Sequence, residues 1–268
     1  PAVPSVGAGN LKIASFNVLN YFNGDGAGGG FPTSSGASSP AEFTRQRDKI
    51  INAISQINAD VVGLIEIENL DLNNTTPALL DLVNGLNAVM GAGTYSFIDD
   101  DLDNNGAQDF NTDEIRCAII YKSSVVTPVG NAMLNDNGAT NRPNLAQTFN
   151  LIASNKNFNF VVNHFKSKGG TGTGADADQG DGQAAFNATR KVQATSLLTF
   201  FNAPATGLIA VSGTNRIISV GDYNAYYEED PMDILRAGGY TVTSTGSSYS
   251  YLFTGQVGSL DHSVLSAS

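Results

Sequence analysis

Residues 215–224, with the sequence Asn-Arg-Ile-Ile-Ser-Val-Gly-Asp-Tyr-Asn, decide the fold that we predict. The β-branched run before Gly221 predicts a buried strand, which the glycine is expected to break. In an extended segment Asp222 and Asn224 then leave the chain on the same face. The pair suits phosphate-ester chemistry, because a carboxylate can align or deprotonate water and an amide can donate to the developing negative charge. The alternative is plain loop chemistry, since Asp and Asn favour turns.

The composition is that of a large, acidic chain with few cysteines. Its 268 residues can form one large α/β domain, and since no Pro/Ser-rich linker divides them we expect a single domain over 1–268. The net charge of −11, with 14 Lys and Arg, repels polyanions and argues against a passive DNA-binding module. A nucleic acid substrate would therefore need bridging cations. The single cysteine, Cys117, lies in an apolar run and is expected to be a buried thiol.

Residues 60–69, Asp-Val-Val-Gly-Leu-Ile-Glu-Ile-Glu-Asn, form the second informative stretch. A continuous apolar run that ends in alternating acids predicts a buried, parallel-type strand with Glu66 and Glu68 on one face at its carboxyl end. Ligands of open α/β sheets bind at this edge. Carboxylates in so apolar a setting are costly unless they are paired or bind metal, and a hard divalent cation would suit them. Solvated acids at a strand end are the alternative.

A histidine ends another predicted strand. Residues 146–152 and 158–164 predict a β-hairpin, whose second strand ends at His164 and is followed by Lys166 and Lys168. A lone histidine usually has a structural role. Beside two lysines at a strand edge, however, this imidazole could bind a scissile phosphate.

An acidic run carries part of a calcium-loop pattern. Asp101, Asp103, Asn105 and Gly106 match the opening Asp-x-Asp-x-Asn-Gly of such a loop. The twelfth position is Thr112 instead of Glu, and no flanking helices are predicted. A surface calcium site and an acidic loop without metal both stay open.

Two further strands place polar residues at their ends. Residues 11–18 alternate as a half-buried strand with Asn17 near its carboxyl end, and residues 259–265 predict a late strand with Asp261 near its start. No apolar run approaches 18 residues and no signal peptide is present, while the start at Pro1 without Met suggests a processed product. Amphipathic helices are predicted from Pro40 and over 76–90, and a further helix is predicted over 184–202.

The order of these strand-end residues resembles that of the endonuclease/exonuclease/phosphatase family, which includes deoxyribonuclease I. The residues that carry the resemblance are Asn17, Glu66, His164, Asp222, Asn224 and Asp261. The sequence is most similar to the secreted bacterial branch of extracellular nucleases. That similarity rests on residues 16–22, 60–69, 162–168, 175–182, 221–231 and 258–266.

The resemblance implies a four-layered α/β sandwich of two mixed sheets flanked by helices, and phosphodiester hydrolysis assisted by Mg²⁺ or Mn²⁺. By the same resemblance, Glu66 is the principal metal ligand and Asn17 is a metal-linked or water-mediated partner. His164 would bond a phosphate oxygen, while Asp222 and Asn224 would orient the nucleophile and stabilise the transition state. Asp113 matches a further site position less securely. One metal would act as a Lewis acid over in-line attack by water.

Two features depart from the family pattern. Members of this branch carry a cysteine pair flanking the acidic loop, where this chain has Gly169-Gly170 and Ala184-Ala185. The family also ends in a Ser-Asp-His-x-Pro motif whose His pairs with the Asp that Asp261 resembles. This chain stops at Ser268, so we expect that it lacks its C-terminal strand.

His262 follows Asp261 directly, and adjacent strand residues point to opposite faces, so it should not replace the absent histidine. The alternative is that Asp261-His262 is itself the terminal motif. Together with Lys166, Lys168 and Asp113, His262 remains a candidate for contacting substrate or supporting the site.

These observations favour a secreted, monomeric, metal-dependent nuclease acting on DNA, and also on RNA in a broader form of the hypothesis. Its partner would be the nucleic acid substrate, with no membrane span and no protein partner. A phospholipid phosphodiesterase or phosphatase of the same fold is one alternative. A non-catalytic calcium-binding domain is another.

Overall fold

The computed structural model describes residues 6–7, 9–69, 76–98, 113–136, 142–244, 249–253 and 255–267. The candidate calcium residues Asp101, Asp103 and Asn105 therefore lie outside the described residues. The chain divides into two compact units, which are described in turn. The first unit comprises Pro1–Asn131 and Phe149–Lys156, and the second comprises Ala132–Thr148 and Asn157–Ser268.

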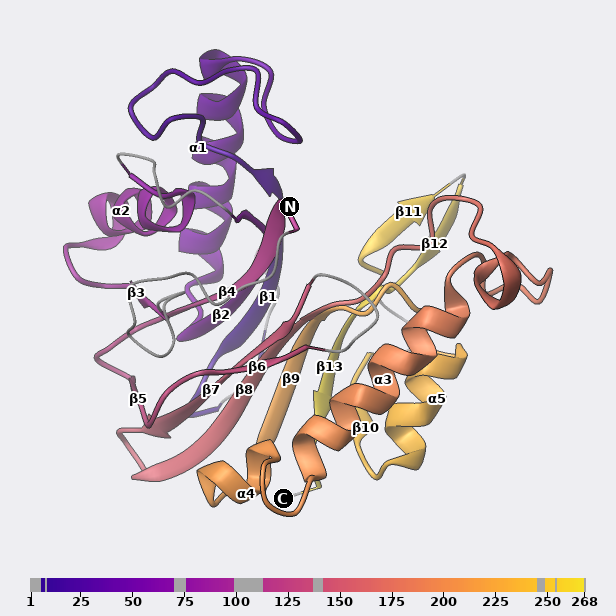
Figure 1. Cartoon of the computed structure of the whole chain (residues 1–268). Coiled ribbons are helices and arrows are strands. Elements are labelled where there is room, and N and C mark those ends of the chain that lie inside the picture. Colours follow the sequence, from indigo (N-terminus) through magenta and orange to yellow (C-terminus); the bar gives the residue numbers. More distant parts are fainter. Residues whose placement is uncertain are drawn as a thin grey trace. The chain divides into compact units, whose positions relative to one another are not determined.

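The first unit is built on a four-stranded mixed sheet (Figure 1). Strand β2 is parallel to β1 on one side and antiparallel to β4 on the other, so the sheet order is β1-β2-β4-β3. The buried run predicted over residues 60–69 forms β2, one of the two inner strands of this sheet. The strands are β1 (Ile13–Tyr21), β2 (Val61–Glu68), β3 (Ser96–Phe97) and β4 (Ile115–Tyr121).

Two helices, α1 (Pro40–Ile57) and α2 (Ala78–Met90), pack with this sheet into one core. Helix α1 begins where Ser39 accepts a hydrogen bond from the backbone N–H of Glu42, with Pro40 in the first turn. Fully buried core residues such as Ile54, Leu64 and Leu82 come from α1, β2 and α2. Burying each such side chain contributes about 1.5–3 kcal/mol, which explains how the helices are held on the sheet.

The second unit is organised around a seven-stranded mixed sheet of order β10-β13-β9-β8-β7-β5, with β6 paired to β7. Strand β5, and the turn between β7 and β8, fall within the residue ranges of the first unit. The strands are β5 (Val126–Pro128), β6 (Met133–Asn135), β7 (Asn144–Leu151), β8 (Lys156–His164), β9 (Ile217–Asp222), β10 (Thr241–Val242) and β13 (Asp261–Leu265).

Helices α3 (Asn187–Asn202) and α5 (Asp230–Ala237) lie side by side and share a core with strands of this sheet (Figure 1). The unit also contains the 3₁₀ turn η1 (Gly174–Asp176), helix α4 (Leu208–Ser212) and the hairpin β11 (Tyr251–Phe253)–β12 (Gln256–Gly258). Two mixed sheets with packed helices confirm the predicted α/β fold class. A single domain that lacks its C-terminal strand stays a prediction.

Gly221 does not break its strand, contrary to the expectation from sequence. Strand β9 continues through it to Asp222, and Gly221 has φ +138°. A Cβ atom at this position would overlap the backbone of Asn163 on the parallel neighbour β8. The glycine therefore serves close approach of two strands, a role that sequence alone does not separate from strand ending.

Gly221→Ala tests this close approach. Because the added methyl group would force β8 and β9 apart at a strained φ, we expect it to lower the free energy of unfolding by about 2–4 kcal/mol, measured by urea denaturation. The matched control is Gly169→Ala, where a Cβ would have open space. Equal stability of the two variants would contradict a packing role for Gly221.

Candidate active site

Glu66 sits at an irregularity in the sheet of the first unit. The β1–β2 register shifts between Asn17 and Tyr21, and the β2–β4 register shifts between Leu64 and Ile67. Glu66 itself has φ +67°, a left-handed conformation that is rare for a residue with a side chain. Bulges and backbone strain of this kind concentrate at functional sites, where they re-aim a side chain.

The Glu66 carboxylate is held by residues of β1. The side-chain amide of Asn17 donates to Oε1 at 2.8 Å, and the backbone N–H of Asn20 donates to Oε2 at 3.1 Å. The carbonyl oxygen of the Asn17 side chain accepts from the backbone N–H of Leu19. Asn17 thus orients Glu66. A carboxylate fixed in this way, half-buried at a strand end, suits a divalent cation that keeps most of its water.

Glu68 and Asp113 lie close to this strand end within the same unit. Glu68 accepts from the backbone N–H of Asn23 at 3.1 Å. Asp113 accepts from the backbone N–H of Ile115, and its carbonyl accepts from the side chain of Asn69 at 2.8 Å. Asp113 therefore anchors the start of β4 opposite the end of β2. Its contribution to a site stays a prediction.

In the second unit, three predicted site residues meet at neighbouring strand ends. His164 is paired in register with Asp222 across the parallel strands β8 and β9. Asp222 is also the register partner of Asp261 across the antiparallel strands β9 and β13. Sequence positions almost one hundred residues apart thus form one row at the edge of the sheet. The strand-end pattern predicted that these three residues belong to one site, and their role in such a site stays a prediction.

Asn224 does not extend this row in the way expected from the sequence. It has φ +47°, and its backbone N–H donates to Oδ1 of Asp222 at 2.7 Å. The chain therefore turns directly after Asp222. The expectation that Asp222 and Asn224 leave an extended segment on the same face is wrong. The buried Asn224 amide donates to the carbonyl of Phe165 at 3.0 Å and ties the turn to the end of β8.

His164 is buried, with 4% of its surface exposed. Its burial, together with the charges of Arg142 and Lys166, lowers its pKa from 6.5 to about 3, so the ring is neutral at physiological pH. The guanidinium of Arg142 lies 3.3 Å from Nε2. Because a guanidinium only donates, Nε2 accepts and the ring proton is on Nδ1. His164 is therefore a neutral polar group whose ring contacts the positively charged side chain of Arg142.

His262 lies on the other face of β13 from Asp261, as the alternating burial of that strand requires. Its ring is 3% exposed, packs edge-on against Tyr223, and donates from Nε2 to the carbonyl of Ala225 at 2.7 Å. Burial lowers its pKa. His262 thus supports the turn after Asp222 from within the core.

Lys168 was a candidate for contacting substrate, but the structure pairs it elsewhere. Its Nζ lies 2.5 and 2.6 Å from the two carboxylate oxygens of Glu229 and donates to the carbonyl of Gln183 at 2.9 Å. The same ammonium group lies 5.1 Å from the ring centroid of Tyr226. Lys166 differs: its Nζ lies over the ring of Phe186 at 4.4 Å. Lys168 is a structural cation, and Lys166 keeps the candidate role.

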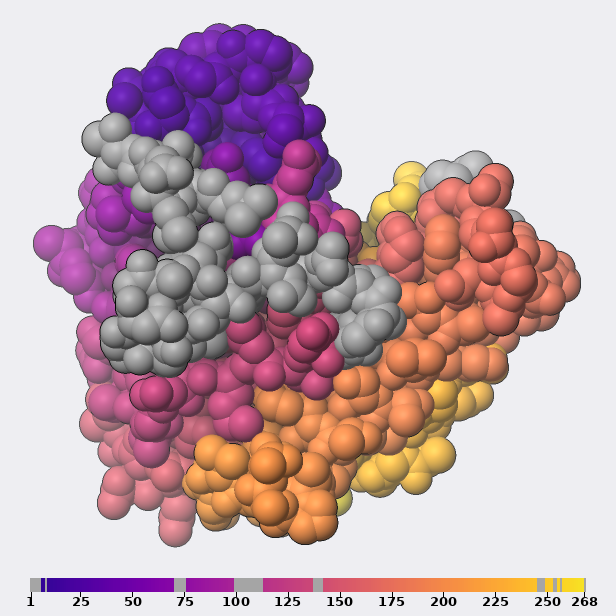
Figure 2. Space-filling view, in the orientation of Figure 1, coloured from indigo at the N-terminus to yellow at the C-terminus, as the bar shows by residue number. Residues whose placement is uncertain are grey.

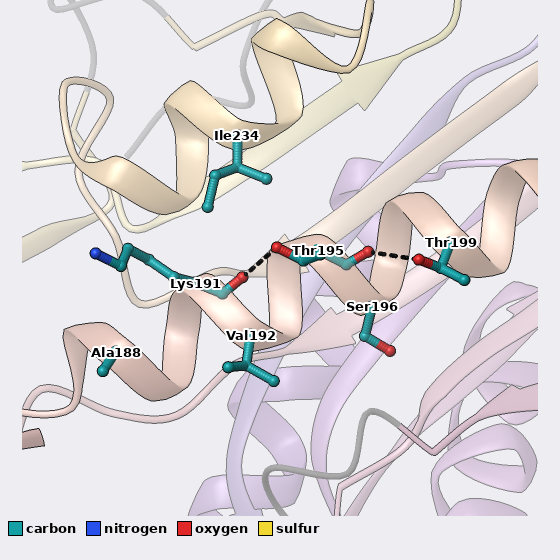
Figure 3. A pocket seen from close by; sticks show the side chains of 7 residues that line it. All are labelled: Ala188, Lys191, Val192, Thr195, Ser196, Thr199 and Ile234. Carbon is teal, nitrogen blue, oxygen red and sulfur yellow. Dashed lines mark hydrogen bonds between the residues drawn. The ribbon is translucent and has the colours of Figure 1, made fainter. Parts of the chain in front are cut away.

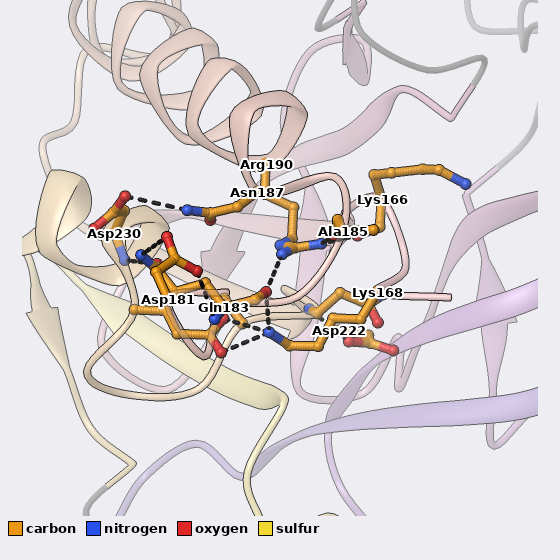
Figure 4. Close-up of polar contacts among 12 residues, drawn as sticks. Lys166, Lys168, Asp181, Gln183, Ala185, Asn187, Arg190, Asp222 and Asp230 are labelled. Atoms are coloured by element: carbon orange, nitrogen blue, oxygen red, sulfur yellow. Dashed lines mark hydrogen bonds and ion pairs between the residues drawn. The ribbon is translucent and has the colours of Figure 1, made fainter. Parts of the chain in front are cut away.

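A buried arginine clamps the segment that follows His164 (Figure 4). Arg190 of α3 is fully buried and donates to the carbonyls of Gln183 and Ala185 at 2.7 and 2.8 Å, and to that of Lys166 at 3.4 Å. Asp230 joins the cluster, because its backbone N–H donates to the side chain of Gln183. This clamp closes the two ends of the loop 169–185, which lies at the surface (Figure 2).

The strand-end row is distinct from the hollow on helix α3 (Figure 3). This hollow has a volume of about 570 Å³, and Ile234 of α5 closes one side of it. The hydroxyls of Thr195 and Thr199 donate to carbonyls of their own helix, so they offer little to a ligand. Its other lining residues are Ala188, Lys191, Val192 and Ser196. Within the described ranges, no group of three or more His, Cys, Asp or Glu side chains gathers in metal-binding geometry.

Sequence reasoning missed Arg142, Arg190 and Glu229 as partners of the site. Arg142 lies just before β7 in a stretch without periodicity, and its contact with His164 arises from strand pairing. Arg190 and Glu229 belong to helix α3 and to the turn before α5. A charged residue next to polar ones gives no sign of burial, so no sequence signal could have identified them.

Replacing Arg190 should open the clamp. We expect Arg190→Met to lower the free energy of unfolding by about 3 kcal/mol, because three carbonyl groups lose a charged donor. The matched control is Lys191→Met at the next position, where the side chain is 46% exposed and pairs with Asp230. Its effect should stay within about 0.5 kcal/mol. Chemical denaturation of both variants would measure the two free energies of unfolding. If Arg190→Met lost no more stability than Lys191→Met, Arg190 would not clamp this segment.

The pKa of His164 predicts how stability depends on pH. Its folded-state pKa of about 3 lies below the ordinary 6.5, so the unfolded chain binds more protons between these values. The stability is therefore complete above pH 6.5 and is lost as the pH falls towards 3. From pH 7 to pH 5 we expect wild type to lose about 2 kcal/mol more than His164→Gln does. If the free energy of unfolding changed by the same amount between pH 7 and pH 5 in both proteins, the imidazole would not be buried and neutral.

Comparison with solved structures shows the same fold in proteins of low sequence identity. The human Nocturnin catalytic domain with bound sulfate has a TM-score of 0.59 at 16% identity, over 96% of this chain and 82% of that one. A Bacteroides thetaiotaomicron mannosyl-6-phosphatase has a TM-score of 0.57 at 13% identity, over 96% of this chain and 86% of that one. D. rerio TDP2 complexed with a single-strand DNA product has a TM-score of 0.54 at 15% identity, over 96% and 83%.

A search of curated proteins finds no significant match. The described part of the chain contains no helix both long and apolar enough to cross a membrane. The model of the endonuclease/exonuclease/phosphatase family matches residues 14–267. With nearly the whole sequence matched, the chain belongs to this family of phosphate-ester hydrolases, whose enzymes generally use divalent metal ions.

Proposed function

We propose that this protein is a secreted nuclease that hydrolyses phosphodiester bonds of DNA with the help of Mg²⁺ or Mn²⁺. The observation that carries the proposal is the row of His164, Asp222 and Asp261 on adjacent strands. Such a row offers a carboxylate to activate water beside a group that can bond a phosphate oxygen. Family membership supports hydrolysis of a phosphate ester. DNA as the substrate, endonuclease action and the metal belong to the proposal.

In the first unit, Glu66 is the residue that would hold the metal ion. Its donors Asn17 and Asn20 hold the carboxylate in one orientation, which fits a cation bound through one carboxylate and water. A bound divalent ion would polarise the phosphoryl oxygen and offset the negative charge of the substrate. This donor set suits a hard cation, since it contains oxygen ligands and no thiolate.

In the second unit, Asp222 would orient the attacking water, and Asp261 is the next acid in the same row. His164 is neutral, so it cannot attract a phosphate by charge. Arg142, held 3.3 Å from its ring, supplies that charge instead and presents donors suited to phosphate oxygens. Asn224 keeps Asp222 in place through the turn that it forms. Action of residues of both units on one phosphate remains a prediction.

The choice of DNA and of an extracellular location has separate support. The TDP2 structure among the structural neighbours holds a single-strand DNA product. The chain itself is acidic, with 29 Gly and no Trp, a composition that fits an extracellular enzyme. A phosphatase is the second candidate, because the mannosyl-6-phosphatase shares the fold equally well.

Cleavage assays with paired variants test the proposal. We expect plasmid DNA to be cleaved with Mg²⁺ or Mn²⁺ and not in excess chelator, because the phosphate needs a cation. Glu66→Gln and Asp222→Asn should each lower the rate at least about 100-fold. The matched control is Glu228→Gln, which should leave the rate unchanged because the Glu228 side chain is 87% exposed.

Three outcomes would argue against the nuclease. Cleavage that persists in excess chelator would show that the reaction needs no metal ion. Full activity of Glu66→Gln would show that Glu66 is not the metal ligand. Hydrolysis of sugar phosphates in the absence of DNA cleavage would favour the phosphatase instead.

A further inference from the structure

The hairpin β11–β12 belongs to a stretch without charge. Residues 237–260 contain no Asp, Glu, Lys, Arg or His, although the chain as a whole has a net charge of −11. The hydroxyl of Ser250, at the base of the hairpin, accepts from the backbone N–H groups of Leu260 and Asp261 at 3.0 and 3.1 Å. The hairpin is therefore fixed to the strand that begins with Asp261 (Figure 1).

The two faces of the hairpin differ in chemistry. Leu252 is paired in register with Val257, and Tyr251 with Gly258. Because successive strand residues point to opposite faces, Leu252 and Val257 share one face and Tyr251 lies on the other. Leu252 and Val257 are 62% and 61% exposed, and Tyr251 is 44% exposed. An apolar face and an aromatic face are thus both open to solvent.

The aromatic face adjoins the turn that follows Asp222. A Cβ atom at Gly258 would overlap the ring of Tyr226, so Tyr226 packs directly on the backbone of β12. Because Gly258 is the register partner of Tyr251, a Cβ atom at Gly258 would point to the same face as the Tyr251 side chain, and the ring of Tyr226 therefore lies on that face as well. Tyr226 stands four residues after Asp222, and Tyr251 stands ten residues before Asp261. Each tyrosine is thus close in sequence to one of the two acids of the row.

We infer that Tyr226 and Tyr251 form a tyrosine seat on which a base of single-stranded nucleic acid stacks while its phosphate lies at the Asp222–Asp261 row. The inference rests on the proposed nuclease function and names its substrate class. Bases of every kind can stack on an aromatic ring, so such a seat binds without sequence preference. An uncharged surface also spares the substrate the repulsion of an acidic protein.

Charge favours nucleic acid over a lipid surface as the occupant. Membrane-docking segments combine apolar residues with Lys and Arg that attract anionic headgroups, and residues 237–260 have none. Lys168 lies 5.1 Å from the ring centroid of Tyr226, and its charge is already paired with Glu229.

Binding of two matched oligonucleotides tests the seat. The probes are single-stranded phosphorothioate DNA, which resists cleavage, and the same strand with abasic tetrahydrofuran sugars. Both are titrated with Mg²⁺ present and followed by fluorescence anisotropy. We expect wild type to bind the base-bearing strand about tenfold more tightly than the abasic one, since stacking is lost without bases. Tyr251→Ala should abolish this preference and leave the affinity for the abasic strand unchanged.

Four further variants separate the effect of the Tyr251 ring on binding from the effects of lost apolar surface and of misfolding. Tyr251→Phe should keep the preference, while Tyr251→Leu should lose it, because only the first retains a ring. Gly258→Ala should reduce it by displacing Tyr226. Leu252→Ala, on the opposite face of the hairpin, is the control and should bind as wild type does.

Equal affinity of wild type for both strands would overturn the seat. So would a loss for Leu252→Ala as large as that for Tyr251→Ala. Co-sedimentation of wild type with phosphatidylcholine vesicles that Tyr251→Ala abolishes, with oligonucleotide binding unchanged, would assign the hairpin to membranes instead. Because binding is measured without cleavage, failure of the seat is distinguishable from failure of the proposed nuclease activity.

Discussion

The parallel pairing of β8 with β9 is the constraint on which the candidate site depends. It sets His164 beside Asp222, and it requires the backbones at Asn163 and Gly221 to come closer than any side chain would allow. Behind this contact, the buried amide of Asn163 donates to Ser219, to the carbonyl of Val220 and to the hydroxyl of Tyr223. A polar network this deep in the core is stable only when nearly every donor is satisfied, so it fixes the register of the two strands.

The same register explains why one turn can serve several purposes. Asp222 ends β9, and the chain reverses at once through the left-handed Asn224. The turn is bonded to Phe165 on one side and to His262 on the other, through Asn224 and Ala225. Its position is therefore defined by both neighbouring strands, which suits a carboxylate that must hold water in one orientation.

The sequence predicted the parts of the site that follow from strand periodicity. Buried runs ending in Glu66, His164 and Asp222 could be recognised because apolar patterning and strand ends are local properties. The bulge at Glu66 and the turn at Asn224 could not, since a left-handed φ at a non-glycine residue depends on bonds to other strands. Arg142 and Arg190 were missed for the same reason. Their contacts depend on a ring partner for Arg142 and on carbonyl partners for Arg190, which only tertiary structure supplies.

The closure of the loop 169–185 by Arg190 and Lys168 has a consequence for where the protein can work. By the resemblance to secreted nucleases, a cysteine pair would close this loop with a disulfide, and a disulfide depends on an oxidising compartment. Here a guanidinium and an ammonium group bind carbonyls and Glu229 instead. With Cys117 as its single, buried thiol, the chain has no covalent cross-link to reduce. The loop is therefore indifferent to thiols in its surroundings, and the chain needs no oxidative folding step to close it.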